Sequence, residues 1–192
     1  MQMTGDCAGR QRLAGEVGGG VNANTMLYIF GGLPGAGKST LSLSLARYLK
    51  AVYLRIDSIE QAIRNAGGTI HGPEGYTVGY MLAADNLRLG HAVIADSVNP
   101  LRITRDAWCD VAVKATVPFV EIEVMCSDKI AHRERVESRS SEILGLKLPT
   151  WEEVTHRGYE IWDRKHIVLD TAEQTPDQSF AVLLNSLKHF LI

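Results

Sequence analysis

The chain has 192 residues, of which 22% are charged and 45% hydrophobic, and its formal net charge at pH 7 is −2. This length fits one domain with a substantial core, and it leaves little room for two full domains. The near-neutral charge gives no argument from composition for a nucleic acid or an anionic membrane as partner. Partners must therefore be argued from individual sites.

The cysteines and the apolar runs indicate where the protein works. Cys7, Cys109 and Cys126 show no C-x-x-C spacing, which does not suggest a disulfide framework or a zinc site, so we expect a reducing cytoplasm. The longest apolar runs, such as FVEIEVM, are strand-sized and far shorter than the ~20 residues that cross a bilayer. The N-terminus has no apolar core of a secretory signal, so we expect neither secretion nor a membrane partner.

Residues 1–25 differ from the rest of the chain. They contain six glycines and no repeating apolar pattern. We therefore expect a disordered N-terminal extension at 1–25 and one folded domain at 26–192. Because Met26 opens the first apolar run, we interpret the preceding residues as an upstream extension of the natural start.

From Met26 onward, short apolar runs alternate with longer amphipathic segments, which predicts a parallel α/β sheet covered by helices on both faces. Such folds bind ligands at the carboxyl ends of their strands, so we look for site residues there. The predicted strands lie near 26–31, 52–57, 92–96, 118–126 and 166–169, and the predicted helices near 38–50, 58–66, 76–89, 101–115, 128–141, 151–163 and 177–190.

The segment FGGLPGAGKST follows the first predicted strand and opens the first predicted helix. It contains the pattern Gly32-x-x-x-x-Gly37-Lys38-Ser39, in which glycines let backbone amides turn toward phosphate oxygens and the helix N-terminus adds its unpaired amides. Lys38 would reach the β- and γ-phosphates of ATP, and the Ser39 hydroxyl would bind Mg²⁺. The alternative is an ordinary glycine-rich turn capped by Ser39. The predicted ATP-binding residues are Gly35, Ala36, Gly37, Lys38, Ser39 and Thr40.

The rest of the sequence narrows the class of nucleotide-binding protein. An N-K-x-D-like stretch and a D-x-x-G after a strand are both absent, which argues against a GTP switch. The chain also has no additional region of the kind that a mechanical ATPase would need. Its small size favours a self-contained phosphotransferase.

Four segments, GGLPGAGKST, VYLRIDSIEQAI, AVIADSVNP and HRERVESR, together resemble the small P-loop kinases of the nucleoside-monophosphate-kinase-like group. Within it, the chain is similar to AAA-type kinases related to gluconate kinases, adenylylsulfate kinases, chloramphenicol phosphotransferases, zeta toxins and polynucleotide kinase domains. The resemblance covers 26–187. It implies a three-layer P-loop NTPase fold with about five parallel strands in the order 2-3-1-4-5, a helical lid near 128–150, and ATP with Mg²⁺ as cofactors.

Asp57 closes the second predicted strand. The resemblance implies that an acidic residue here contacts the acceptor hydroxyl as its base or orienting group, which makes Asp57 both a catalytic and a substrate-binding candidate. The alternative is a helix N-cap, because Asp57 directly precedes SIEQAI and Glu60 lies three residues on. Both roles remain open, since one strand-end aspartate can perform both.

Asp96 ends the third predicted strand in the manner of a Walker B acid. It would hold Mg²⁺ near Ser39 or contact substrate, although a strand-end aspartate can also be a simple turn former. Arg102 follows in SVNPLR, together with Ser97 and Asn99. These residues could line the acceptor pocket, and a loop with a helix cap is an equally good interpretation.

Three arginines lie where the resembled kinases have their lid, in HRERVESR. Arg135 and Arg139 are four residues apart and share a helix face, while Arg133 points elsewhere. Forked guanidinium groups suit the charge of a phosphoryl group in flight, so we choose Arg133 and Arg139 as catalytic candidates. Interleaved glutamates leave a solvated, ion-paired helix as the alternative.

Two further segments are candidates for binding. The glycine-rich segment 66–80 lies where the resembled kinases vary their acceptor site, and it is either a substrate loop or a flexible surface loop. By resemblance, Asp170 and Thr171 would lie near the adenine. The histidines show no metal-ligand spacing.

These observations predict an ATP-dependent phosphotransferase that moves the γ-phosphate to a hydroxyl of a small-molecule acceptor. One alternative within enzymes is a 5′-hydroxyl polynucleotide kinase, although no basic cluster outside the lid supports a nucleic acid partner. The competing class is a non-kinase ATP-binding or ATPase module that acts on a protein partner. The sequence names neither the acceptor nor the oligomeric state.

Overall fold

The structure, a computed structural model, describes residues 25–190 of the chain. The predicted extension at 1–25 lies outside these residues except for Thr25. The buried hydroxyl of Thr25 donates a hydrogen bond of 2.8 Å to the carbonyl of Gly90. Among the described helices, none combines the length and the apolar character that crossing a membrane requires.

Strands and helices alternate along the described residues, as the sequence pattern predicts. In chain order they are β1 (Leu27–Gly31), α1 (Lys38–Leu49), β2 (Val52–Arg55), α2 (Ile56–Asn65), α3 (Glu74–Arg88), β3 (Val93–Asp96), α4 (Arg102–Ala115), β4 (Phe119–Met125), α5 (Lys129–Ser138), α6 (Trp151–Thr155), β5 (Ile167–Asp170) and α7 (Pro176–Phe190).

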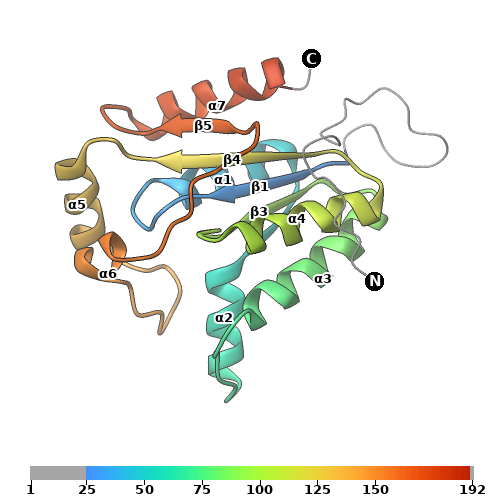
Figure 1. Cartoon of the computed structure of the whole chain (residues 1–192), viewed down its shortest axis with the longest axis horizontal. Coiled ribbons are helices and arrows are strands. Elements are labelled where there is room, and N and C mark those ends of the chain that lie inside the picture. Colours follow the sequence, from blue (N-terminus) through green and yellow to red (C-terminus); the bar gives the residue numbers. More distant parts are fainter. Residues whose placement is uncertain (1–24, 191–192) are drawn as a thin grey trace.

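The strands form one parallel sheet in the order β2-β3-β1-β4-β5, which confirms the predicted fold. Asp96 at the end of β3 is the partner of both Phe30 in β1 and Arg55 in β2. All carboxyl ends therefore lie at one edge of the sheet, and Figure 1 shows α5 and α6 beyond that edge. This edge is where the predicted site residues converge.

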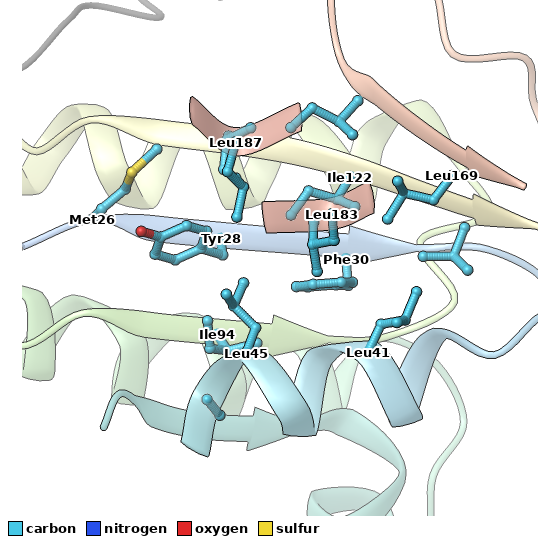
Figure 2. Close-up of a cluster of buried hydrophobic side chains, with 14 of the residues drawn as sticks. Met26, Tyr28, Phe30, Leu41, Leu45, Ile94, Ile122, Leu169, Leu183 and Leu187 are labelled. Carbon is cyan, nitrogen blue, oxygen red and sulfur yellow. The ribbon is translucent and has the colours of Figure 1, made fainter. Parts of the chain in front are cut away.

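Alternating side chains of the strands build two cores, one on each face of the sheet. Tyr28 and Phe30 of β1 pack with leucines of α1 and α7, as Figure 2 shows. Leu27 and Ile29 point to the opposite face, where α2, α3 and α4 cover them. The result is a three-layer α/β/α arrangement in which β1 is buried on both faces.

The predicted helix at 151–163 is wrong beyond its first turns, because α6 ends at Thr155. The following segment leaves helical geometry, and its carbonyls bind a side chain instead. Buried Arg105 donates hydrogen bonds to the carbonyls of Glu160 and Ile161, both at 3.2 Å. Trp162 packs so closely on β1 that a Cβ atom at Gly31 would lie 2.4 Å from its ring. Tertiary contacts override the local helical pattern here.

Candidate active site

The loop between β1 and α1 is packed against the lid side of the molecule. Gly32, Gly35 and Gly37 have φ angles of 136°, 87° and 93°, a region that other residues rarely adopt. A Cβ atom at Gly32 would lie 2.1 Å from the carbonyl oxygen of Val124 in β4, and one at Gly35 would lie 2.5 Å from Val136 in α5. The glycines are therefore needed for both conformation and space.

The N-terminus of α1 is free to bind an anion. Its N-cap is Gly37, which has no side chain to accept hydrogen bonds from the first amides of the helix. The alternative interpretation, a turn capped by Ser39, is therefore not what the structure shows. Unpaired amides and the positive end of the helix dipole favour a phosphate group at this point.

Lys38, Asp96 and Tyr53 form a buried charged cluster beneath the loop. The Lys38 Nζ lies 3.4 Å from Asp96 Oδ1, and the Tyr53 hydroxyl donates a hydrogen bond of 2.6 Å to Asp96 Oδ2. Burial raises the pKa of Asp96, but the Lys38 ammonium and hydrogen bonds from Tyr53 and Ser39 outweigh it and hold this pKa below its usual range. Asp96 is thus an ionised carboxylate at the C-terminal end of β3.

These residues fit a Mg²⁺ ion. The Asp96 Oδ1 atom is buried and has no hydrogen-bond partner among the described residues. The Ser39 hydroxyl is within reach of the same carboxylate. Carboxylate and hydroxyl oxygens are the hard ligands that Mg²⁺ prefers, usually with several waters and phosphate oxygens. The predicted pair Ser39 and Asp96 is therefore brought together.

A cleft of about 1660 Å³ opens from the phosphate-binding loop toward α2, α3 and the segment 139–149. A typical small-molecule pocket has roughly 300–1,000 Å³, so this cleft has room for more than one molecule. Asp57 lines the same cleft as Lys38 and Ser39.

Asp57 lies in the first turn of α2, because β2 ends two residues earlier than predicted. The N-cap of α2 is Arg55, and no side-chain capping hydrogen bond is present. The capping interpretation of Asp57 is therefore wrong. Its side chain is 45% exposed, and its Oδ2 lies 4.0 Å from the Arg55 Nε.

The lid helix α5 is docked on the phosphate-binding loop. The Arg135 guanidinium donates hydrogen bonds of 2.8 and 3.0 Å to the hydroxyl and carbonyl of Thr171. The Thr171 hydroxyl in turn donates to the Ala36 carbonyl at 2.9 Å, and His132 Nε2 lies 2.9 Å from the Pro34 carbonyl. Asp128 caps the helix by accepting from the amides of Ile130 and Ala131.

The predicted arginines separate into two groups. Arg139 is half-buried in the cleft, whereas Arg133 is largely exposed and pairs with Glu137 at 2.8 Å. Arg102 is also outside the cleft, where its guanidinium pairs with Asp163 at 2.6 Å. The structure thus brings Arg139 to the site and leaves Arg133 and Arg102 in surface ion pairs. The predicted helix near 128–141 ends at Ser138, so Arg139 follows α5 in extended geometry and does not share a helix face with Arg135.

Two further residues of the site, Tyr53 and Arg55, are not among those predicted from the sequence. Their side chains share one face of β2, because alternate strand residues point to the same face. Arg55 is the register partner of Asp96 in β3. The alternation in VYLR could have shown that they share a face. The register that places them against Asp96 has no signal in a single sequence. Arg135, and not Arg133, contacts the loop indirectly, because its guanidinium donates to Thr171 and the Thr171 hydroxyl donates to the Ala36 carbonyl.

Within the segment 66–80, residues 74–80 form the start of α3, and residues 66–73 connect it to α2. Glu74 begins the helix and accepts hydrogen bonds from the amides of His71 and Gly72. Tyr76 and Tyr80 of this helix line the cleft. Thr171 lines a smaller hollow of about 250 Å³ on the other side of the loop, with Gln174 among its walls.

The sheet order and the glycine loop after β1 define the class, a P-loop NTPase fold. Solved structures with this fold include Kti12 from Chaetomium thermophilum in complex with ADP-AlF3, at 21% identity and a TM-score of 0.63 over 86% of this chain and 99% of that chain. A candidate kinase from Chloroflexus aurantiacus has 22% identity and a TM-score of 0.64 over 86% and 96%. The APS kinase CysC from Mycobacterium tuberculosis, with AMPPNP and APS, has 16% identity and a TM-score of 0.59 over 85% and 97%.

The family follows from the sequence itself. A family model described as an AAA domain matches residues 27–147, which include the loop, Asp57, Asp96 and the lid helix. The chain belongs to this AAA domain family, and its fold is that of P-loop kinase-like proteins. Among curated proteins, none matches the sequence.

Proposed function

We propose that this protein is a phosphotransferase that moves the γ-phosphate of ATP to a hydroxyl group of a small-molecule acceptor. One observation carries the proposal: Asp57 lines the same cleft as Lys38 and Ser39 of the phosphate-binding loop. A cleft that holds both a phosphate cradle and an exposed carboxylate can bring a donor phosphate and an acceptor hydroxyl together.

The donor side consists of the loop and the buried cluster. The free amides of α1 and the Lys38 ammonium bind the phosphates of ATP, and Ser39 and Asp96 hold Mg²⁺. Bound there, Mg²⁺ would neutralise charge on the β- and γ-phosphate oxygens. The adenine of ATP binds in the hollow beside Thr171 and Gln174, which Arg135 also lines. AMPPNP and ADP-AlF3 in structures of the same fold support a nucleotide as ligand.

The acceptor side consists of α2, α3 and the segment after α5. The acceptor oxygen attacks the γ-phosphorus and forms a new P–O bond, while the bond from that phosphorus to the β,γ-bridging oxygen breaks. ADP leaves with the electron pair of the broken bond. The Asp57 carboxylate takes the hydroxyl proton, and Arg139 lies near Asp57 on the acceptor side of the cleft.

Substitutions at the two sides separate binding from transfer. Transfer is measured from γ-labelled ATP to a panel of sugars, sugar acids, nucleosides, antibiotics and 5′-hydroxyl oligonucleotides, beside ATP affinity. We expect Lys38→Ala to lower transfer at least about 100-fold, because it removes a charge from the phosphates. Asp57→Asn should keep ATP affinity and lower transfer by about 10²- to 10⁴-fold, because it removes the base.

The matched control is Asp85→Asn, a change at an exposed carboxylate of α3 that pairs only with Arg88 among the described residues. It should transfer phosphate at the rate of the unmodified protein. An Asp57→Asn protein that transfers at full rate removes Asp57 from the mechanism. ATP binding without transfer to any acceptor favours the non-kinase module, and label on oligonucleotides alone favours the polynucleotide kinase.

A further inference from the structure

Basic side chains gather in the cleft of a chain whose overall charge is negative. Among the described residues, the arginines that line the cleft are Arg47, Arg55, Arg64, Arg135, Arg139 and Arg157. The acidic residues that line it are Asp57, Glu60 and Glu142. The formal net charge of the whole chain is −2, so the basic lining is a local feature of the cleft.

Some of these charges already have partners or belong to the donor side. Arg64 pairs with Glu60 at 3.4 Å on the same face of α2. Arg135 is held by Thr171 at the loop. Arg47 and Arg157 are exposed, whereas Arg55 and Arg139 are half-buried at the acceptor side, next to Asp57.

Arg55 and Arg139 are incompletely satisfied. The Nε atom of each is buried and has no hydrogen-bond partner among the described residues. Arg55 has one carboxylate oxygen of Asp57 at 4.0 Å, which is beyond hydrogen-bond distance. A buried N–H without an acceptor is unfavourable, so an acceptor from outside the chain would stabilise both side chains.

The two guanidiniums also repel each other. Burial lowers the pKa of Arg139, the charge of Arg55 lowers it further, and Asp57 raises it. Asp57 and the more distant Asp96 are the carboxylates near Arg55, and Asp96 is already engaged by Lys38 and Tyr53. Two like charges facing one carboxylate leave an excess positive charge that a bound anion would neutralise.

We propose that Arg55 and Arg139 form an anion subsite for the acceptor, which is therefore a small hydroxyl compound that carries a carboxylate, sulfate or phosphate group. The assignment of this anion to the acceptor rests on the proposed function. Binding of an anion at Arg55 and Arg139 is independent of that function. The anionic group binds between the two forked side chains, because guanidinium geometry matches oxyanions. The acceptor hydroxyl then lies at Asp57, toward the phosphate-binding loop.

The first test is anion binding without turnover. The nucleotide site is filled with Mg²⁺ and a non-hydrolysable ATP analogue, and binding of labelled inorganic sulfate is measured by equilibrium dialysis. We expect one sulfate to bind per chain when the nucleotide site is filled. We expect Arg55→Gln to lower the affinity for this sulfate about tenfold or more. Arg55→Lys keeps the positive charge but loses the forked guanidinium. Its affinity for sulfate should lie between those of the unmodified protein and of Arg55→Gln.

The matched control is Arg88→Gln, at an exposed arginine of α3 that pairs with Asp85 outside the cleft. It should bind sulfate like the unmodified protein, which shows that general charge is not responsible. Absence of the bound sulfate, or equal affinity in Arg55→Gln and Arg88→Gln, overturns the subsite. Binding of the ATP analogue by each variant confirms that it is folded.

The second test uses pairs of acceptors that differ in charge, such as glucose with gluconate and uridine with uridine 3′-phosphate. We expect the charged member of a pair to have a kcat/KM about tenfold or more higher, and Arg55→Gln to remove that preference. A preference for the neutral member, or one that Arg55→Gln leaves unchanged, contradicts the subsite while the kinase stands. If no acceptor is phosphorylated, the proposed function fails, and the sulfate measurement alone decides the subsite.

Discussion

At the scale of single residues, Asp96 connects the features of the donor side. Its carboxylate is buried at the end of β3, and it interacts with Lys38 of the loop and Tyr53 of β2. Buried charges are stable only when they are paired and hydrogen-bonded. Tyr53 therefore stabilises the ionised carboxylate at one oxygen, while Lys38 pairs with the other.

Removal of the Tyr53 hydroxyl tests this arrangement. We expect Tyr53→Phe to lower the free energy of unfolding by about 1–3 kcal/mol, because it leaves Asp96 Oδ2 buried without its donor. The measurement is urea denaturation at neutral pH. Tyr48→Phe is the control, since the Tyr48 side chain is exposed and its ring contact with Phe180 survives the change. Equal stability of the two variants would show that the 2.6 Å hydrogen bond contributes nothing.

At the scale of elements, the strands and the loop were predictable, and the site was predictable only in part. Buried strands and a glycine loop leave strong local signals, so β1, the loop and α1 were placed within one residue or two. The position of Asp57 in the cleft depends on where β2 stops and α2 begins. β2 ends two residues before the predicted boundary, so Asp57 lies in a helix and not at the end of a strand.

The segment 156–166 shows why the rest was not predictable. Its partners, Arg105 and Gly31, are distant in sequence, and no periodicity reports such contacts. The same holds for the lid, where Arg135 rather than Arg133 faces the loop because α5 docks through His132 and Thr171. Orientation of a helix about its own axis is set by packing, which a charged and polar sequence leaves open.

His166, just before β5, makes the stability of this region depend on pH. A hydrogen bond from His166 Nε2 to Glu123 in β4, 3.1 Å long, raises the pKa of His166 against the opposing effect of burial. A raised folded-state pKa gives stability that is complete below the unfolded value of about 6.5 and is lost as pH rises through the folded value.

His166→Gln should therefore be more destabilising in acid than in base. We expect the loss in unfolding free energy to be about 1 kcal/mol larger near pH 5.5 than near pH 8.5. Denaturation at both pH values measures it, with exposed His91→Gln as the control. A loss that is the same at both pH values would mean that the charged form of His166 gains nothing from Glu123.

At the scale of the whole molecule, the parallel sheet brings the residues of the proposed site to one edge. β1 supplies the phosphate-binding loop, β3 ends in Asp96, and β2 runs into the helix that carries Asp57. One cleft spans these elements, and α5 lies over the loop side of it. The proposed transfer to an acceptor would use the part of this cleft that extends beyond the phosphate-binding loop.

The most direct measurement of this transfer is the release of ADP from Mg²⁺-ATP with and without a pool of hydroxyl acceptors, alongside the labelled phosphate that reaches them. We predict that ADP release is slow without acceptor, rises with the pool, and equals the phosphorylated product mole for mole. Release of ADP and inorganic phosphate at an unchanged rate, whether or not acceptors are present, would contradict the phosphotransferase and favour an ATPase that serves a protein partner.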